Sequence, residues 1–420
     1  METAGEGAQV QIRFVTKQQQ YAVPNFPLSV PSESPVTELN ALVNELLKES
    51  NDQKKTVEFD FLVNSEFLRT TLKEHIAERE ISCENVIDIE YIEKHPPPEP
   101  QDCLIHDDWV SAVAMQDKWI LSGCYDNTLH IWTAKGAHHL NIPVYHTAAI
   151  KSVAWISMDN ESATFVSASQ DQTAVIWKWD ISSNSVEIVA VCKGHERGLE
   201  RVGVNASNNL MATGAWDTML KIWSSSLHDD QENGEPPSKR SKSDPSKTRM
   251  PIRTIKAHRE AVSGVVWSDK AELITGSWDH SIKIWDAELG GMKHEIPGNK
   301  SFFDIDYSPL NRTIIAGSAD RHVRLFDPRS TDTVVKTQFT SHSSWVSAVS
   351  WSATDEHLFL SGAYDNQVKL WDTRSSKAPL FDLSGHEDKV LCCNWSNPKY
   401  LISGGADNTV RIFKSKHAVH

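Results

Sequence analysis

The chain has 420 residues and a formal net charge of −14, with 56 acidic and 42 basic side chains. That length predicts two or three domains, and 39% apolar with 23% charged residues is the composition of an ordinary soluble globular protein. The excess of acid argues against general nucleic-acid binding, which requires an excess of base to offset phosphate charge. No apolar stretch approaches the ~20 residues of a membrane span, and residues 1–9 lack the features of a signal peptide, so we expect no membrane partner.

Residues 9–93 predict a small α+β domain. Alternation of apolar and polar residues predicts strands, and a Ser-Pro start followed by apolar residues at helical spacing predicts a helix. The expected strands are 9–15, 21–23, 57–63 and 86–92, and the expected helices are 34–48 and 72–77. This order, ββαβ(α)β, is typical of a ubiquitin-like β-grasp fold. Because the last strand continues into the chain and does not end in a free Gly-Gly, we do not expect the domain to act as a conjugated modifier.

A proline-rich segment follows this domain. Residues 94–100 contain Pro96, Pro97, Pro98 and Pro100, and consecutive prolines fix φ, remove hydrogen-bond donors and favour an extended backbone. All 15 tryptophans of the chain come after this segment. We therefore predict a linker over 94–100 and a second domain over 101–420.

The second domain consists of an internal repeat with a period of about 40–45 residues. The recurring phrase is Ser/Thr-Gly-x-x-Asp-x-x-x-x-Ile-Trp, with short alternating strands and turn residues around it. The aspartates of its seven copies are Asp126, Asp171, Asp217, Asp279, Asp320, Asp365 and Asp407. The copies resemble the repeats of the WD family, which implies one propeller blade per copy. The expected fold class is therefore mainly β, a seven-bladed WD β-propeller preceded by a small ubiquitin-like domain.

Each copy also carries polar residues that predict a buried hydrogen-bond network. The aspartate can accept bonds from turn amides and from a histidine, whose other nitrogen can meet a Ser or Thr hydroxyl that also accepts the Trp indole N–H. Six copies have all three polar residues: His106, Ser122 and Asp126; His146, Ser167 and Asp171; His195, Thr213 and Asp217; His258, Thr275 and Asp279; His342, Ser361 and Asp365; His386, Ser403 and Asp407. Five of the six also have the tryptophan, at Trp132, Trp177, Trp223, Trp285 and Trp371. The fifth copy has Ala316, Phe326 and no histidine, and we expect it to be the loosest blade.

Ser, His and Asp are also the components of a hydrolase triad. An active site is needed once, whereas this set recurs six times at one spacing, so we interpret it as structural. The sequence shows no other nucleophile motif, metal cluster or glycine-rich phosphate loop. We therefore expect a protein that is not an enzyme and uses no cofactor and no small-molecule substrate.

The ends of the repeat region predict how the propeller closes. Only seven residues follow Phe413, too few for a convincing fourth strand in the last blade. Residues 102–106 precede the first copy and have no blade of their own. We expect them to pair with the last blade and to join the two ends of the ring.

The interval between Asp217 and Asp279 is 62 residues, against 41–46 between the other copies. The excess maps to residues 224–250, which are almost free of aliphatic side chains and should form a disordered insertion. A basic cluster within it, Lys239, Arg240 and Lys242, predicts a nuclear localisation signal. The alternative is a merely solvated run of charge.

The residue before each turn aspartate predicts a docking surface. It is a large aromatic in four copies, Tyr125, Trp216, Trp278 and Tyr364, although the network requires no aromatic there. Trp and Tyr dominate the binding energy of protein interfaces, so these four residues are candidates for binding a partner protein. The alternative is that each ring only packs against the adjacent blade.

The two domains together resemble the family of WD-repeat subunits of the PeBoW complex. The resemblance rests on residues 59–72 (FDFLVNSEFLRTTL) and 81–94 (ISCENVIDIEYIEK) of a Notchless-like N-terminal domain, and on residues 106–113 (HDDWVSAV) before the repeats. It implies a scaffold for rRNA processing and maturation of the large (60S) ribosomal subunit, located in the nucleolus and nucleoplasm of the nucleus. The implied partners are pescadillo, the second propeller subunit of the complex, pre-60S particles and the AAA ATPase midasin.

The resemblance also implies how such a factor is removed. The ubiquitin-like domain offers a carboxylate, here Glu84, to a Mg²⁺ site of midasin, which then pulls the factor off the pre-ribosome; Mg²⁺ accepts such an oxygen ligand. Glu84 is otherwise one of several acids in this region, and the residues alone do not distinguish it from Glu80 or Asp88. An alternative function is that of a WD-repeat substrate receptor or adaptor of a ubiquitin ligase, whose partners would be cullin adaptors.

Overall fold

The computed structural model describes residues 9–51, 56–82, 85–227, 247–329 and 335–415. The chain divides into two compact units, one made of Met1–Pro97 with Arg374–Ala378 and one made of Pro98–Thr373 with Pro379–His420. None of the helices in the described ranges is long and apolar enough to cross a membrane.

The N-terminal unit is built on one five-stranded sheet with the order β2-β1-β5-β3-β4. Its strands are β1 (Gln9–Val15), β2 (Leu28–Pro31), β3 (Phe59–Val63), β4 (Glu66–Phe67) and β5 (Ile87–Glu93). Its helices are α1 (Val36–Asn51) and α2 (Leu72–Glu78), with a short 3-10 helix at Gln19–Tyr21. β1 runs parallel to β5, and the other strand pairs are antiparallel. This arrangement is the β-grasp topology, so the predicted ubiquitin-like domain is confirmed.

One predicted strand of this domain is wrong. β1 pairs with Leu28–Pro31, and the expected partner, residues 21–23, begins inside the 3-10 helix. Tyr21 packs its ring edge-on against Phe59, and its hydroxyl donates to Glu93 over 2.9 Å. These contacts hold the segment against β3 and β5, so that it does not lie alongside β1.

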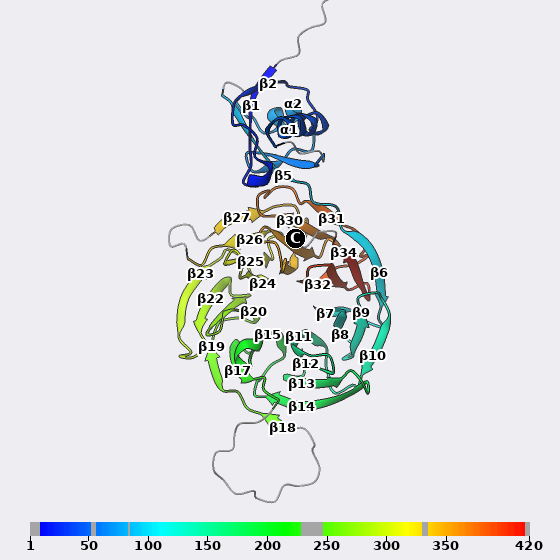
Figure 1. Cartoon of the computed structure of the whole chain (residues 1–420). Helices are drawn as coiled ribbons and strands as arrows, with labels where there is room; N and C mark the ends of the chain where they lie inside the picture. Colours follow the sequence, from blue (N-terminus) through cyan, green and yellow to red (C-terminus); the bar gives the residue numbers. More distant parts are fainter. Residues whose placement is uncertain (1–8, 52–55, 83–84, 228–246, 330–334, 416–420) are drawn as a thin grey trace, which may run out of the picture. The chain divides into compact units, whose positions relative to one another are not determined.

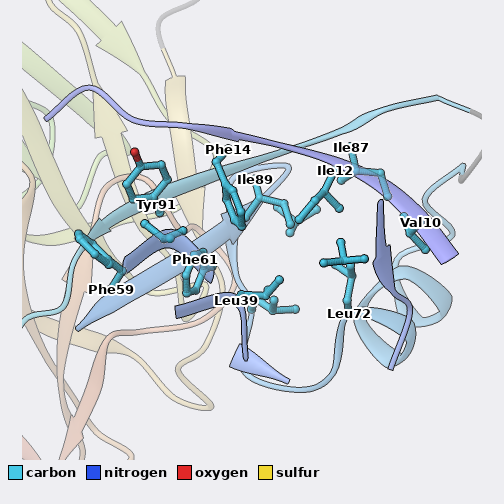
Figure 2. Packing of buried hydrophobic residues seen from close by; sticks show 14 of the residues in the cluster. Val10, Ile12, Phe14, Leu39, Phe59, Phe61, Leu72, Ile87, Ile89 and Tyr91 are labelled. Carbon is cyan, nitrogen blue, oxygen red and sulfur yellow. The ribbon is translucent and has the colours of Figure 1, made fainter. Parts of the chain in front are cut away.

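Apolar side chains from the sheet and from both helices fill the core of this unit (Figure 2). Val10, Ile12 and Phe14 alternate along β1 and are buried on one face, as the period of a strand requires. Leu39 of α1 and Leu72 of α2 are fully buried in the same cluster. The alternation that predicted the strand is therefore the alternation that fills the core.

The second unit is a ring of seven sheets, one for each copy of the repeat (Figure 1). Blade one consists of β7 (Val110–Gln116), β8 (Trp119–Cys124), β9 (Leu129–Thr133) and β10 (His138–Ile142). Blade two contains β11 (Ile150–Met158), β12 (Ser162–Ser169), β13 (Thr173–Asp180) and β14 (Ser185–Lys193). Blade three consists of β15 (Leu199–Asn205), β16 (Leu210–Ala215), β17 (Met219–Ser224) and β19 (Arg253–Lys256). A 3-10 helix, Ala206–Asn208, joins β15 to β16. Blade four consists of β20 (Val262–Asp269), β21 (Glu272–Ser277), β22 (Ser281–Asp286) and β23 (Met292–Pro297). Blade five consists of β24 (Phe302–Ser308), β25 (Thr313–Ser318), β26 (Val323–Phe326) and β27 (Val335–Phe339). Blade six consists of β28 (Val346–Trp351), β29 (Leu358–Ala363), β30 (Val368–Asp372) and β31 (Phe381–Leu383). Blade seven is β32 (Val390–Asn397), β33 (Tyr400–Gly405), β34 (Thr409–Lys414) and β6 (Glu99–Ile105), and the predicted seven-bladed propeller is confirmed.

A sharp turn follows the second strand of each blade at the repeated aspartate. The residue after the aspartate has a φ between 60° and 72° in all seven copies: Asn127, Gln172, Thr218, His280, Arg321, Asn366 and Asn408. In six blades the carboxylate accepts the backbone N–H two residues further on, at 2.9–3.2 Å. This bond stabilises a backbone conformation that residues other than glycine rarely adopt. The aspartate is therefore part of the turn as well as of the network.

β6 closes the ring as the outer strand of blade seven. It pairs antiparallel with β34, with Leu104 opposite Val410 and Cys103 opposite Arg411, so the predicted pairing of the two ends is confirmed. The strand begins at Glu99, within the segment that the sequence assigned to the linker. A proline is tolerated in this strand because it lies at the edge of its sheet.

The ends of the long insertion are ordered, contrary to the prediction of disorder over the whole of 224–250. β17 includes Ser224, and β18 (Lys247–Arg249) adds in parallel to β14, the outer strand of blade two. Arg249 is buried, and its guanidinium donates to the carbonyls of Ser224 and Ser226 at 2.7 and 2.9 Å. The free edge of β14 supplies backbone partners that the composition of the insertion does not reveal. The predicted import cluster, Lys239, Arg240 and Lys242, lies outside the described residues.

Candidate protein-docking site

The repeated histidines, hydroxyls and aspartates form a buried hydrogen-bond network. In five blades the histidine Nδ1 lies 2.8–3.0 Å from the nearer carboxylate oxygen, and its Nε2 lies 2.7–2.8 Å from the Ser or Thr hydroxyl. Four tryptophan indoles donate to four of these hydroxyls at 2.8–2.9 Å, and in blade one Trp132 donates to Ser122 at 3.1 Å. The histidines of the five blades are His146, His195, His258, His342 and His386, each at most 7% exposed. Because the set is buried and repeated around the ring, it stabilises the blades.

Blade one departs from the predicted network. The Nε2 atom of His106 meets the predicted hydroxyl at 2.8 Å, but its Nδ1 faces the carbonyl of Leu104 at 3.3 Å and not the carboxylate of Asp126. The hydroxyl of Thr128 contacts both Asp126 and His130, and the ring of His130 lies edge-on to that of His106 with the centroids 5.1 Å apart. Burial and the neighbouring His130 lower the pKa of His106 to about 4, which leaves its imidazole neutral at physiological pH.

Blade five, which lacks the histidine and the tryptophan, uses other polar contacts. The guanidinium of Arg324 donates to both carboxylate oxygens of Asp320. On the inner strand, Asp304 and Asp306 accept backbone N–H groups of blade six at 3.1 and 2.7 Å. Arg201 of blade three forms an ion pair with Asp304. These contacts replace part of the missing network, and the expectation that blade five is the loosest stays a prediction.

The four aromatic residues predicted for docking lie together. Tyr125, Trp216, Trp278 and Tyr364 line one depression of about 260 Å³, to which the inner strands of all seven blades contribute. The depression is thus one end of the central channel. Trp216 is 39% exposed, and the other three rings are half-buried. The four rings are therefore not all buried between blades, and their role in docking stays a prediction.

The sequence reasoning missed three aromatic residues of the same surface, Trp109, Phe303 and Trp345. Five rings follow one another with centroid separations of 5.3, 6.3, 5.5 and 5.8 Å, and we call them the aromatic arc: Trp216, Trp278, Phe303, Trp345 and Tyr364. Trp109 lies 5.3 Å from the ring of Tyr125. Trp109 and Trp345 are 41% and 50% exposed. Both come three residues after a network histidine, in HDDW and HSSW, and this shared spacing is the signal that could have found them.

Charged side chains line the depression inside the aromatic arc. The ammonium of Lys151 lies 3.2 Å from one oxygen of Glu200 and donates to the hydroxyl of Tyr125 at 3.0 Å. The other oxygen of Glu200 accepts the indole N–H of Trp216 at 2.9 Å. Burial alone would lower the pKa of Lys151, but Glu200 and Tyr125 together outweigh burial and raise the pKa, so the ammonium stays charged. The aromatic wall is therefore joined to an ordered ion pair.

Glu84, the carboxylate predicted to reach a partner's Mg²⁺, lies outside the described residues. Helix α2 ends at Glu78 and β5 begins at Ile87, so Glu84 belongs to the connection between these elements. Of its two alternatives, Asp88 accepts two guanidinium bonds from Arg13, both of 2.7 Å. Within the described ranges, no group of three or more His, Cys, Asp or Glu side chains could hold a metal ion.

Both domains match known protein families. Residues 10–76 match the NLE (NUC135) domain, and residues 99–133, 186–224, 249–286, 290–327, 333–372 and 377–414 match the WD domain, G-beta repeat. The copy at Asp171 lies outside these segments, but it has the strands and the complete network of a blade. The fold and its repeats define a WD-repeat propeller protein with an N-terminal NLE domain.

Relatives of this architecture are similar over the whole chain. The ribosome biogenesis protein WDR12 homolog of Aedes aegypti is 56% identical over 419 residues, which are 99% of this chain and 98% of that protein. The homolog of Culex quinquefasciatus is 56% identical over 414 residues, 98% of this chain and 96% of that protein. The homolog of Anopheles gambiae is 54% identical over 420 residues, 99% of this chain and 97% of that protein. The chain belongs to this family of WDR12 homologs, as the resemblance to WD-repeat subunits of the PeBoW complex predicted.

Proposed function

We propose that the chain is a non-enzymatic assembly factor, a scaffold for rRNA processing and for maturation of the large (60S) ribosomal subunit in the nucleolus and nucleoplasm. The observation that carries this proposal is the identity of 54–56%, over nearly the full length, with proteins named for ribosome biogenesis. Fold alone does not imply function. Identity at this level extends through both domains and the segment between them, so it supports a shared role of the whole molecule.

The propeller supports a role in binding other proteins. Its repeated serines, histidines and aspartates are tied to one another in the interior, whereas a hydrolase presents its nucleophile to a substrate. The exposed rings of Trp109, Trp216 and Trp345 are of the type that contributes most to protein interfaces. We infer that Tyr125 and the aromatic arc, with Trp216, Trp278 and Tyr364 as its predicted members, dock on pescadillo or on the second propeller subunit of the PeBoW complex.

For the NLE domain we propose the role that the family resemblance implies, in which Glu84 supplies a carboxylate to the Mg²⁺ site of midasin. A metal ligand must have free oxygen lone pairs to give to the ion. Asp88 already accepts bonds from two N–H groups of Arg13, which makes it a poorer candidate than an acid in the preceding connection. Midasin would then remove the factor from pre-60S particles by pulling on this domain.

The basic cluster Lys239, Arg240 and Lys242 is the proposed import signal for this nuclear role. Its residue types and spacing suit such a signal, and a scaffold of ribosome assembly has to reach the nucleus. Import together with a partner protein is the competing route.

Purification of the tagged full-length protein, with identification of the proteins that accompany it, tests the proposal against its alternative. Pescadillo, the second propeller subunit and proteins of large-subunit precursors are the expected partners. Cullin adaptors in their place would support a substrate receptor or adaptor of a ubiquitin ligase and contradict the proposal. A parallel purification of the Trp216→Ala variant tests the docking surface, because this change removes an exposed ring.

A further inference from the structure

The depression inside the aromatic arc offers hydrogen-bond donors but few free acceptors. Each oxygen of Glu200 already accepts one bond, one from Lys151 and the other from the indole N–H of Trp216. An ammonium has three donors, and Lys151 directs two of them to Glu200 and Tyr125, which leaves a third. Arg201 also lines the depression, and its ion pair with Asp304 uses only part of a guanidinium that has five donors. The depression therefore has N–H groups that are available to donate hydrogen bonds to a bound partner.

A tryptophan of the arc points to the same conclusion. The Nε1 atom of Trp278 is buried and has no acceptor within the described part of the chain. The equivalent aromatic position in blade three, Trp216, has an acceptor in Glu200. A buried donor without a partner is unfavourable. A turn of the Trp278 indole toward the depression, which it lines, would give its N–H a partner if an acceptor were bound there.

The charge of the lining differs between the two ends of the central channel. The depression is lined by two cations, Lys151 and Arg201, and one carboxylate, Glu200. The opposite end, a cavity of about 580 Å³, is lined by Asp117, Asp304 and Asp306, and it shares Arg201. The end that carries the aromatic arc is thus the one suited to an anion.

We propose that this depression receives the side-chain carboxylate of an aspartate or glutamate, presented by a loop of the protein that docks on the aromatic arc. The inference rests on the docking role proposed above and specifies the chemistry of the partner. A carboxylate can accept bonds from Lys151, Arg201 and Trp278 together, and bonds between charged groups are shorter and stronger than neutral ones. The exposed rings of Trp216 and Trp345 then pack against apolar neighbours of that acid. The partner segment is therefore an acidic residue flanked by apolar residues.

Three capped peptides test the proposal on the full-length chain. Ac-Ala-Glu-Ala-NH₂ carries a side-chain carboxylate, Ac-Ala-Gln-Ala-NH₂ is its neutral match, and Ac-Ala-Ala-OH has only a terminal carboxylate. The readout is the set of tryptophan indole resonances in ¹⁵N–¹H spectra of the deuterated protein. We expect the glutamate peptide to shift the indole signals of Trp216 and Trp278 and to bind about tenfold or more tightly than the glutamine peptide. The indoles of Trp223 and Trp285 donate to buried hydroxyls and serve as internal controls that should not move.

Three results would overturn the proposal. Equal shifts from the glutamate and glutamine peptides, or no shift of Trp216 and Trp278 with the glutamate peptide, would show that the depression does not select a carboxylate. Stronger binding of the terminal carboxylate than of the glutamate peptide would assign the site to a chain end. None of these measurements requires a variant to fold. A further test uses the Lys151→Met variant, whose fold is checked by unchanged control indole signals. It should lose most of the shift that the glutamate peptide induces.

The outcome is separable from the docking role. If Trp216→Ala abolishes copurification of the partners while the peptides show no carboxylate preference, the docking surface stands and the carboxylate proposal is overturned. If the glutamate peptide binds selectively while Trp216→Ala leaves copurification unchanged, the site is supported and the docking role of the arc is contradicted.

Discussion

Cys103, near the start of the propeller, lies directly opposite Arg411, near its end, in the antiparallel pairing of β6 with β34. Residues opposite each other in such a pair have Cα atoms about 4.5–5.5 Å apart, which is within the range a disulfide can bridge. The relationship shows that the ring is closed by non-covalent pairing between the two ends of the domain. It also offers a direct way to measure what that closure contributes.

The Arg411→Cys variant should form a disulfide with Cys103 and stabilise the propeller. In the chain-entropy model, a disulfide that closes so long a loop raises the free energy of unfolding by up to about 5 kcal/mol. The substitution breaks no hydrogen bond of the Arg411 Nε atom, because this atom has no partner in the described structure. We expect a melting temperature several degrees higher under oxidising conditions, reversed by a reducing agent. Arg411→Ser is the matched control, and equal melting temperatures of the oxidised and reduced variant would show that closure does not limit stability.

The free energy of unfolding should fall with decreasing pH over a range that the pKa of His106 determines. Burial and the neighbouring His130 lower the pKa of His106 to about 4, whereas an unfolded histidine has a pKa of about 6.5. The unfolded state therefore binds the proton first, and stability is lost as pH falls from about 6.5 to about 4, by up to about 3 kcal/mol. His106→Gln should remove this part of the pH dependence of chemical unfolding, and His280→Gln, at an exposed turn, should keep it. An unchanged profile in His106→Gln would contradict the assignment.

A second loss of stability is expected at lower pH. Burial raises the pKa of Asp171 and Asp365, but the histidines and the backbone N–H donors together outweigh burial and lower the pKa to about 2, below the value of about 3.9 for an unfolded aspartate. These carboxylates thus contribute stability above about pH 4 that disappears toward pH 2. Asp171→Asn should flatten this region in an acid-unfolding curve, while Asp159→Asn, on a turn outside the network, should leave it unchanged.

Trp216→Ala should separate binding from stability. The ring is 39% exposed, so its removal should change the free energy of unfolding by less than about 1 kcal/mol while weakening association with pescadillo or the second propeller subunit. Trp223→Ala is the contrasting variant, because that ring is fully buried and its loss should cost about 3–5 kcal/mol. If Trp216→Ala destabilises the protein as much as Trp223→Ala, the ring serves packing between blades.

Glu84→Gln should leave the NLE domain folded but abolish its Mg²⁺-dependent binding to the domain of midasin that would carry the Mg²⁺ site, here called the adhesion domain. Replacement of a carboxylate by an amide of the same size, away from buried networks, usually changes stability by less than about 0.5 kcal/mol. Glu80→Gln is the matched control because it lies in the same acidic region, and titration of the full-length variants with the adhesion domain gives the readout. Equal binding by the wild type and Glu84→Gln would contradict the proposed ligand role.

Much of the fold could be predicted because its determinants are local and repeated. The period of the repeat fixes the turn aspartates and hence the blades, and residues 102–106 belong to no copy of the repeat, so their pairing with the last blade could be predicted. The strand expected at 21–23 was wrong because Tyr21 makes tertiary contacts with Phe59 and Glu93 that no local pattern contains. β18 was missed for the same reason, since its partner is the edge of another blade.

The candidate site was only partly predictable. Four aromatic rings were found because they occupy one position of the repeat, whereas Phe303 lies on an inner strand and Trp345 on a histidine loop. The curvature of the ring brings these different elements together, and the spacing of the copies does not reveal it. The incomplete network of blade one escaped notice because the other copies have no histidine at the position of His130.

Sedimentation of the tagged full-length protein on a sucrose gradient, with analysis of the RNA in each fraction, is the most direct test of the proposed role in ribosome assembly. We expect the protein to travel with pre-60S particles and with precursors of the large-subunit rRNA. We also expect Glu84→Gln to increase the fraction retained on these particles. A protein found only in the light fractions, free of rRNA precursors and accompanied by cullin adaptors, would contradict this role.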